Sequence, residues 1–287
     1  MAVYRRGYQR FDGALTSHWA RMMVIPRFSW ERMLAQKFVL ILLVVSMFWP
    51  LLCMGFVYVA NHTELWQGFA GGLKKFLAIN GNFFSVFMQT QSLYGLVLAS
   101  VAGPGLIAPD LANNALPLYF SRPLTRADYI LSRMIVLLGL LSLVTILPGL
   151  LVFGMQVGMA GSDWFWNNWR LGAGVFFGFV LYIVMVSLVA MTSSAYVKWR
   201  VVAGALVMAF FFVLAGAAEM VNSVFRVDWA STLNPGYAMN TIWAGMLDVE
   251  IADEKPGVWE CSLFIGGLCA ALLALLARRL RPVEVVR

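Results

Sequence analysis

Charged residues are scarce in this chain: Asp, Glu, Lys and Arg together make up 12% of its 287 residues, whereas apolar residues make up 61%. Soluble domains are usually about one quarter charged. The composition therefore excludes a soluble globular protein and predicts an integral membrane protein. No stretch of the sequence is long and polar enough to add a separate soluble domain.

Six long runs lack Asp, Glu, Lys and Arg altogether; they cover residues 38–63, 76–109, 134–162, 171–197, 201–218 and 261–277. A bilayer core about 30 Å thick requires about 20 helical residues, so each run fits one crossing. Backbone groups find no water in lipid, which favours helices. We expect a single all-α domain over residues 1–287, with spans at about 38–60, 82–108, 130–154, 171–197, 201–221 and 259–277.

Residues that bind metals are equally rare. The chain has two histidines and three cysteines, and Cys53, Cys261 and Cys269 lie in apolar runs at unrelated spacings. This pattern indicates neither a disulfide framework nor a metal site. We expect this chain to bind no metal and no cofactor itself.

Motifs for energy coupling and catalysis are missing as well. The runs hold no Asp, Glu, Lys, Arg or His except His62 near an end, although ion-coupled carriers generally need such residues in the membrane. The sequence has neither a Walker A motif nor a Gly-x-Ser-x-Gly elbow, the usual signatures of a P-loop ATPase and of an α/β-hydrolase. We expect the chain not to be an enzyme and to depend on an external energy source.

Basic residues are divided unevenly between the two sides of the membrane. With six spans, both termini share one side, and that side carries 16 of the 21 Lys and Arg residues, spread over the N-terminal segment, residues 110–133 and 198–200, and the tail 278–287. Basic loops stay in the cytoplasm. We therefore predict a multi-pass protein of the bacterial cytoplasmic (inner) membrane with both termini cytoplasmic. The four separate basic pieces do not form a patch for nucleic acid.

Residues 15–37, within the cytoplasmic segment 1–37, mix aromatic and basic side chains such as Trp19 and Arg21. One interpretation is an amphipathic helix in the plane of the lipid headgroups, broken at Pro26 and capped again by Ser29. The other interpretation is a positively charged segment that only keeps the N-terminus on the cytoplasmic side. The two are compatible.

Residues 221–259 form the longest stretch on the outer side. The apolar spacing over 237–246 predicts a helix that follows the turn Asn234-Pro235-Gly236. Two interpretations of this stretch are open: a re-entrant hairpin that dips into the outer leaflet, and a loop that packs on the helix bundle. Within the runs, Pro50 and Pro148 free a backbone carbonyl and permit kinks.

A polar segment with the sequence PDLANNALPLYFSRPLTRADY occupies residues 109–129, between the second and third runs. Preceded by Gly105-Leu106-Ile107-Ala108, it resembles the corresponding segment of the ABC-2 type permeases of ATP-binding-cassette transporters. In that family an acidic residue ends span two, and a short helix leads through a Ser-Arg-Pro-like turn to a basic residue that opens span three. The motif covers about 25 residues, and the resemblance in topology covers the whole chain.

The resemblance implies a specific assembly. The short helix, at about 110–120, would be a coupling helix that docks in a groove of a separate ATPase subunit, which would bind ATP and Mg. The N-terminal segment would be a connecting helix, and the stretch after span five would hold re-entrant helices. Two permease copies, identical or not, would form the pathway near spans two and five. The coupling residues are Asp110, Leu111, Asn114, Leu116, Leu118, Tyr119, Phe120, Arg122 and Arg126.

The residue types agree with docking. Leu116, Leu118 and Phe120 offer apolar anchors for a helix in a groove, and Arg122 and Arg126 suit acidic partners or lipid phosphates. The alternative is a surface turn with snorkelling arginines, and we favour docking. Asp110 could also cap the short helix.

Three polar residues in span two are candidates for the transport pathway: Gln89, Gln91 and Ser92. Such residues also join helices within the membrane, and we favour that role. The function expected from the sequence is thus the permease subunit of an ATP-driven exporter. The alternatives are a non-transporting membrane anchor or assembly subunit and, less favoured, a secondary carrier.

Overall fold

The computed structural model describes residues 17–62, 78–115, 119, 125–250 and 256–279. Every regular element within these ranges is a helix. Six helices in this part of the chain are long and apolar enough to cross a membrane: Lys37–Asn61, Gly81–Ala112, Arg126–Ala160, Ser162–Tyr196, Arg200–Phe225 and Val258–Arg279. The all-α class and the six candidate spans are therefore confirmed. Several helices extend beyond the charge-free runs, because a helix can continue into polar residues at the membrane surface.

Each of the first three spans consists of two helices. They are α2 (Lys37–Ser46) and α3 (Phe48–Asn61), α5 (Gly81–Ala102) and α6 (Pro104–Ala112), and α8 (Arg126–Val144) and α9 (Ile146–Ala160). The breaks fall at Met47, Gly103 and Thr145, which is three, one and three residues before Pro50, Pro104 and Pro148. These prolines have no N–H to continue the helical hydrogen bonds.

The buried side chain of Gln91, on α5, hydrogen bonds at two of these breaks. In an unbroken helix the Ser46 carbonyl would accept a hydrogen bond from the backbone N–H of residue 50, and the Val144 carbonyl would accept one from residue 148. Both of these residues are prolines and have no N–H. The Gln91 amide nitrogen donates to the Ser46 carbonyl at 3.1 Å and to the Val144 carbonyl at 2.5 Å. One side chain therefore connects the first three spans.

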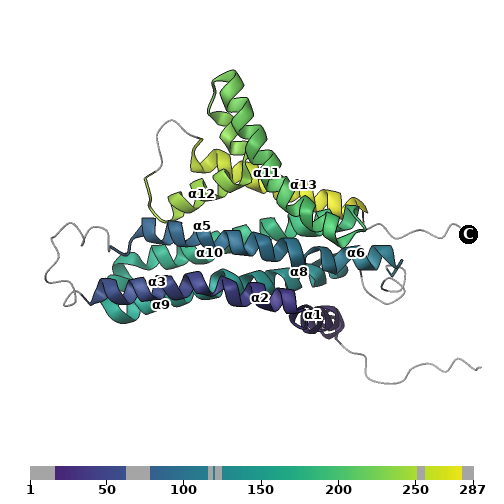
Figure 1. The fold of residues 1–287 in the computed structure, drawn as a ribbon, viewed down its shortest axis with the longest axis horizontal. Coiled ribbons are helices and arrows are strands. Elements are labelled where there is room, and N and C mark those ends of the chain that lie inside the picture. The colour runs from purple at the N-terminus through teal and green to yellow at the C-terminus, as the bar shows by residue number, and fades with distance from the viewer. Residues whose placement is uncertain (1–16, 63–77, 116–118, 120–124, 251–255, 280–287) are drawn as a thin grey trace, which may run out of the picture.

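Helix α1 (His18–Leu34) continues through Pro26, so the predicted break there is wrong. Ser17 caps the helix, its hydroxyl accepting from the Ala20 N–H at 3.2 Å. The carbonyl that Pro26 frees belongs to Met22, and the Ser132 hydroxyl of α8 lies 3.3 Å from it. The same hydroxyl is 2.6 Å from the Asp128 carbonyl, so its one hydrogen is shared between the two acceptors. The neighbouring helix thus places a hydroxyl, shared with its own backbone, beside the carbonyl that the proline leaves free. In Figure 1, α1 is seen end-on while the spans run across the view, so α1 lies crosswise to them.

Helix α10 (Ser162–Tyr196) is the centre of the bundle and packs against α5, α6, α8, α9, α11, α12 and α13. Its core-facing residues include the fully buried Val175 and Phe179. Gly103, at the break in span two, lies against it: a Cβ added there would be 2.6 Å from the Cβ of Ala190. The absence of a side chain at this point allows the two spans to approach closely.

The last helices cover one side of this bundle. They are α11 (Arg200–Phe225), the 3₁₀ helix η2 (Trp229–Leu233), α12 (Pro235–Met246) and α13 (Val258–Arg279). The predicted helix over 237–246 is confirmed as α12, with Asn234 as its N-cap. Trp243 of α12 is buried, and its indole N–H donates to the Gly178 carbonyl at 3.0 Å. Helix α11 is largely exposed along its length and rises away from the other spans (Figure 1).

Candidate functional site

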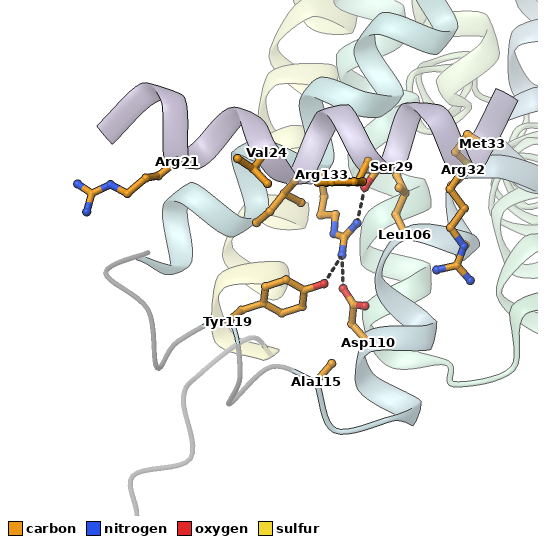
Figure 2. Close-up of a pocket in the computed structure, with 13 residues that line it drawn as sticks. Arg21, Val24, Ser29, Arg32, Met33, Leu106, Asp110, Ala115, Tyr119 and Arg133 are labelled. Atoms are coloured by element: carbon orange, nitrogen blue, oxygen red, sulfur yellow. Dashed lines mark hydrogen bonds and ion pairs between the residues drawn. The ribbon is translucent and has the colours of Figure 1, made fainter. Parts of the chain in front are cut away.

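A polar cluster lies where α1 crosses the ends of α6 and α8 (Figure 2). The local sequence determines where α6 ends and where α8 begins. Asn114 adopts φ 49°, a left-handed conformation that asparagine tolerates and that follows the end of α6. Thr125 begins α8 with a capping box, in which its side chain and that of Asp128 each accept the other's backbone N–H.

The centre of the cluster is an ion pair between Arg133 of α8 and Asp110 of α6. A guanidinium nitrogen, Nη2, of Arg133 donates to Oδ2 of Asp110, and the Tyr129 hydroxyl donates to the same oxygen at 2.7 Å. Tyr129 and Arg133 are four residues apart in the helix and therefore share a face. Arg133 is only 7% exposed, and a buried charge of this kind depends on its partner for compensation.

Arg133 also binds two groups outside these helices. Its Nη1 donates to the Ser29 hydroxyl of α1 at 2.7 Å, and its Nη2 donates to the Tyr119 hydroxyl at 3.3 Å. The guanidinium carbon lies 5.8 Å from the ring centre of Tyr119 and 5.4 Å from that of Tyr129, within the range of cation–π attraction. One side chain thereby links α6, α8, α1 and the segment that joins α6 to α8.

Two further contacts attach α1 to α8. The His18 ring nitrogen Nε2 lies 3.1 Å from Oδ1 of Asp128. Trp30 packs over Gly139, where an added Cβ would be 2.4 Å from its ring carbon Cζ2. Together with the bond from Ser132 to the Met22 carbonyl, these contacts join α1 to the first half of span three.

The predicted short helix over 110–120 does not form as one continuous helix. Helix α6 carries span two through Asp110 to Ala112, and the chain then turns at Asn113 and Asn114. Asp110 is consequently in the last turn of α6, so the alternative in which it caps a new helix is wrong. The physical reason is the left-handed conformation of Asn114, which cannot continue a right-handed helix.

The coupling residues predicted from the sequence are placed only in part. Asp110 and Tyr119 meet in the cluster; Leu111 packs against the core, whereas Asn114 and Arg126 are exposed. The remaining coupling residues lie outside the described part of the chain; they are Leu116, Leu118, Phe120 and Arg122.

A cavity of 620 Å³ opens beside the cluster, between α1 and α6. Three arginines and one aspartate line it: Arg21, Arg32, Arg133 and Asp110. The side chains that α1 contributes besides these are mainly apolar and include Val24, Ile25 and Phe28. The cavity thus combines apolar walls with an excess of positive charge.

Two of the three candidate pathway residues line a second cavity, of 270 Å³, between α5, α10, α11 and α12. Gln89 and Ser92 face it together with Tyr182 and Asn240, and the Tyr182 hydroxyl donates to the Ser92 carbonyl at 2.5 Å. No charged residue among those described lines this cavity. Gln91 is not part of it, because its side chain is enclosed at the helix breaks.

Sequence reasoning missed the two groups that hold the cluster together, Arg133 and Ser29. Arg133 was counted only as one basic residue of the cytoplasmic side. The spacing of Tyr129 and Arg133, with an acidic residue at the end of the preceding span, is the signal that would have pointed to it. Ser29 was assigned to a helix cap, whereas its hydroxyl accepts a hydrogen bond from Arg133 inside α1.

Side chains that bind metals do not cluster in the part of the chain that the structure describes: no three His, Cys, Asp or Glu residues there come together. Cys53, Cys261 and Cys269 are unpaired thiols. The chemistry offered by the described site is therefore ionic and hydrogen-bonding.

Comparison with models of known protein families finds none that matches this chain, and comparison with curated proteins finds no match either.

Proposed function

We propose that this chain is the permease subunit of an ATP-driven transporter of the ABC-2 type, working as an exporter. In this proposal two permease copies form the pathway across the bacterial inner membrane, with their termini in the cytoplasm. A separate ATPase subunit binds ATP and Mg and supplies the energy. The proposal combines the sequence of residues 105–129 with the geometry of the cluster around Arg133.

The observation that carries the proposal is the way Arg133 connects the elements around residues 113–125. Through Asp110 it holds the end of span two, through its own helix the start of span three, and through Ser29 the crosswise helix α1. Close-packed interiors have low compressibility and transmit strain from one group to the next. A partner that pushes on the connecting segment would therefore displace two spans and α1 together, as a coupling element requires.

Two other elements fit the same assembly. Helix α1 has exposed apolar side chains, Trp19 at 63% and Phe28 at 66%, and its crosswise course suits a connecting helix at the membrane surface. In this proposal α12 is the re-entrant helix on the outer side of the membrane. The hydrogen bond from its Trp243 to Gly178 holds it against α10.

The pathway in this proposal lies beside α5 and α11. Helix α11 leaves most of its surface uncovered in a single copy, which provides area for a second permease. The cavity lined by Gln89 and Ser92 lies next to α11, so its polar groups would be available to cargo. Since no charged side chain among those described lines it, this cavity favours uncharged or amphipathic cargo over small ions.

The experiment is a search for an ATPase subunit among the proteins encoded beside this chain, followed by co-purification and reconstitution of the two proteins. We expect the two proteins to purify together and the complex to hydrolyse ATP in liposomes. Leu116→Asp combined with Arg122→Glu should abolish the association without preventing membrane insertion. Lys198→Glu, a change at an exposed basic residue that does not line the cavity beside the cluster, is the matched control and should leave the association intact.

Three results would contradict the proposal. Wild-type association in the Leu116→Asp/Arg122→Glu variant would show that the docking assignment is wrong. Stable association without any ATPase stimulation by transported molecules would favour the membrane anchor or assembly subunit. Transport driven by an ion gradient in liposomes without the ATPase would favour a secondary carrier.

A further inference from the structure

Helix α11 carries an acidic residue, Glu219, in the part of the helix that a bilayer would enclose. The charge-free run ends at Ala218, but the helix continues for seven more residues, to Phe225. Its 26 residues extend over about 39 Å, so a span centred in a hydrocarbon core of about 30 Å would project by about 4–5 Å at each end. Glu219 is six residues, or about 9 Å, before Phe225. It therefore lies within the core of such a span.

Glu219 has no partner among the residues that the structure describes. Apart from Arg200 in its first position, it is the only charged residue of α11. It is exposed, and it forms no ion pair or hydrogen bond with the rest of the described chain. Charged residues in membrane spans almost always face the interior of a bundle or a water-filled cavity, because lipid does not solvate them. We therefore expect water or another molecule, and not lipid, beside Glu219.

The second half of α11 presents two different exposed faces. At 3.6 residues per turn, Phe212 and Ser223 lie within about 40° of Glu219 around the helix axis. Val213 and Met220 lie about 100–120° away from it, and both are exposed and apolar. The face with Val213 and Met220 suits lipid. The face with Glu219 combines a carboxylate, a hydroxyl and an aromatic ring, which suits a molecule that is partly polar and partly apolar.

There is room for a molecule on this second face. Gly216 lies one turn before Glu219, and a Cβ added there would have no atom within 4 Å. Helix α11 also rises away from the other spans (Figure 1). Phe211, eight residues or about 12 Å before Glu219, lines the cavity that Gln89 faces. A molecule that moved from this cavity along α11 to the end of the helix would pass Glu219.

We propose that Glu219 binds the positively charged group of an amphipathic organic cation, and that the cargo of this transporter belongs to that class. The carboxylate attracts the cation, and the ring of Phe212 on the same face adds an aromatic surface that cations favour. The aromatic side chains that line the cavity, Tyr182, Phe211 and Trp243, suit the apolar part of such a molecule. The assignment of the cargo rests on the proposed function, whereas binding of a cation at Glu219 can be measured without the ATPase.

The test uses two probes of nearly the same shape and opposite charge, tetraphenylphosphonium and tetraphenylborate. Equilibrium dialysis measures their binding to the full-length protein in a neutral detergent. We expect the wild type to bind tetraphenylphosphonium more tightly than tetraphenylborate. Glu219→Gln should weaken tetraphenylphosphonium binding by about tenfold, a loss between those of an ion pair in water and one near a protein surface. Glu219→Asp keeps the charge and should retain most of the affinity.

Two variants separate the effect of charge from that of position. Asp228→Asn removes an exposed acidic residue three positions after the last residue of α11, and its side chain caps no helix; it should leave the affinity unchanged. Gly216→Leu keeps Glu219 and fills the space one turn before it, so it should weaken binding on its own. Because no atom lies within 4 Å of the new Cβ, this change should not disturb folding.

Several outcomes would overturn the assignment of Glu219. They are unchanged tetraphenylphosphonium binding in Glu219→Gln, equal binding of both probes by the wild type, and equal losses in Glu219→Gln and Asp228→Asn. If a complex with the ATPase transports cargo while Glu219→Gln binds the cation like the wild type, only this inference is wrong. If binding depends on Glu219 but the chain associates with no ATPase, the cation site stands and the assignment as a permease subunit is wrong.

Discussion

The side chain of Gln91 donates a hydrogen bond to the backbone carbonyl of Val144, the group that would pair with residue 148 if that residue were not proline. The same amide nitrogen also donates a hydrogen bond to the Ser46 carbonyl, which Pro50 leaves free in the first span. Broken helices persist in lipid only where neighbouring groups satisfy the freed carbonyls. Gln91 therefore allows two kinks to lie side by side in the core.

Replacing Gln91 by Leu should destabilise the protein, because it leaves two buried carbonyls without a donor. We expect a loss of about 1–2 kcal/mol in the free energy of unfolding, the range for polar contacts between membrane helices. Unfolding by a denaturing detergent in mixed micelles measures it. Gln89→Leu, a change on the same helix at a residue whose side chain bonds to Ser85 one turn away and, among the described residues, to no other helix, should have little effect.

The mechanism can be separated from simple packing by restoring the missing donor. In a Pro148→Ala background, residue 148 has an N–H for the Val144 carbonyl. The cost of Gln91→Leu should then be smaller than in the wild type. An equal cost in both backgrounds would contradict this account of Gln91.

Breaking the Asp110–Arg133 pair should cost more than removing it. Asp110→Leu leaves Arg133, a residue that is 7% exposed, without its counter-charge, and we expect a loss of about 3–5 kcal/mol in stability. Asp110→Leu with Arg133→Met removes both charges and should be less destabilising than the sum of the single changes. Thermal denaturation of the wild type, the two single variants and the double variant measures this double-mutant cycle. If the losses of the single variants simply add up in the double variant, the two charges do not interact.

A side chain at Gly139 should displace α1. In Gly139→Ala the new Cβ would be 2.4 Å from Cζ2 of Trp30, an overlap that should cost about 1–3 kcal/mol. Trypsin should then cleave α1 after Arg27 faster than in the wild type. Gly154→Ala, where no atom lies within 4 Å of the new Cβ, is the control and should leave cleavage unchanged. Rescue by Trp30→Leu would identify the overlap as the cause.

Trp243→Phe should loosen α12 from α10. The change keeps an aromatic ring but removes the indole N–H that donates to the Gly178 carbonyl at 3.0 Å, and we expect a loss of about 1 kcal/mol. Trp199→Phe, at a residue that is 73% exposed, should have no effect. Comparison of the two thermal midpoints checks the prediction, and equal midpoints would show that the bond adds nothing to stability.

The sequence alone was sufficient for the class and for the number of candidate spans. The six runs free of charge, from 38–63 to 261–277, each contain enough apolar residues for one crossing, and each corresponds to one of the six long apolar helices described. The helix over 237–246 followed in the same way from its apolar spacing and from the turn at Asn234. These features depend on the composition of each segment and on the spacing of its apolar residues, and both can be read from that segment alone.

Only the tertiary structure decided what the prolines and the polar residues do. Pro26 was expected to break α1, but α1 continues, and the hydroxyl of Ser132, 110 residues away, lies beside the Met22 carbonyl that the proline frees. Gln91 reaches carbonyls 45 and 53 residues away, and Arg133 is buried because Asp110, Ser29 and Tyr119 meet around it. Such pairings depend on which helices pack together, and no local pattern contains that information. The sequence determined which segments form apolar helices; the packing of those helices determined where their few polar groups find partners.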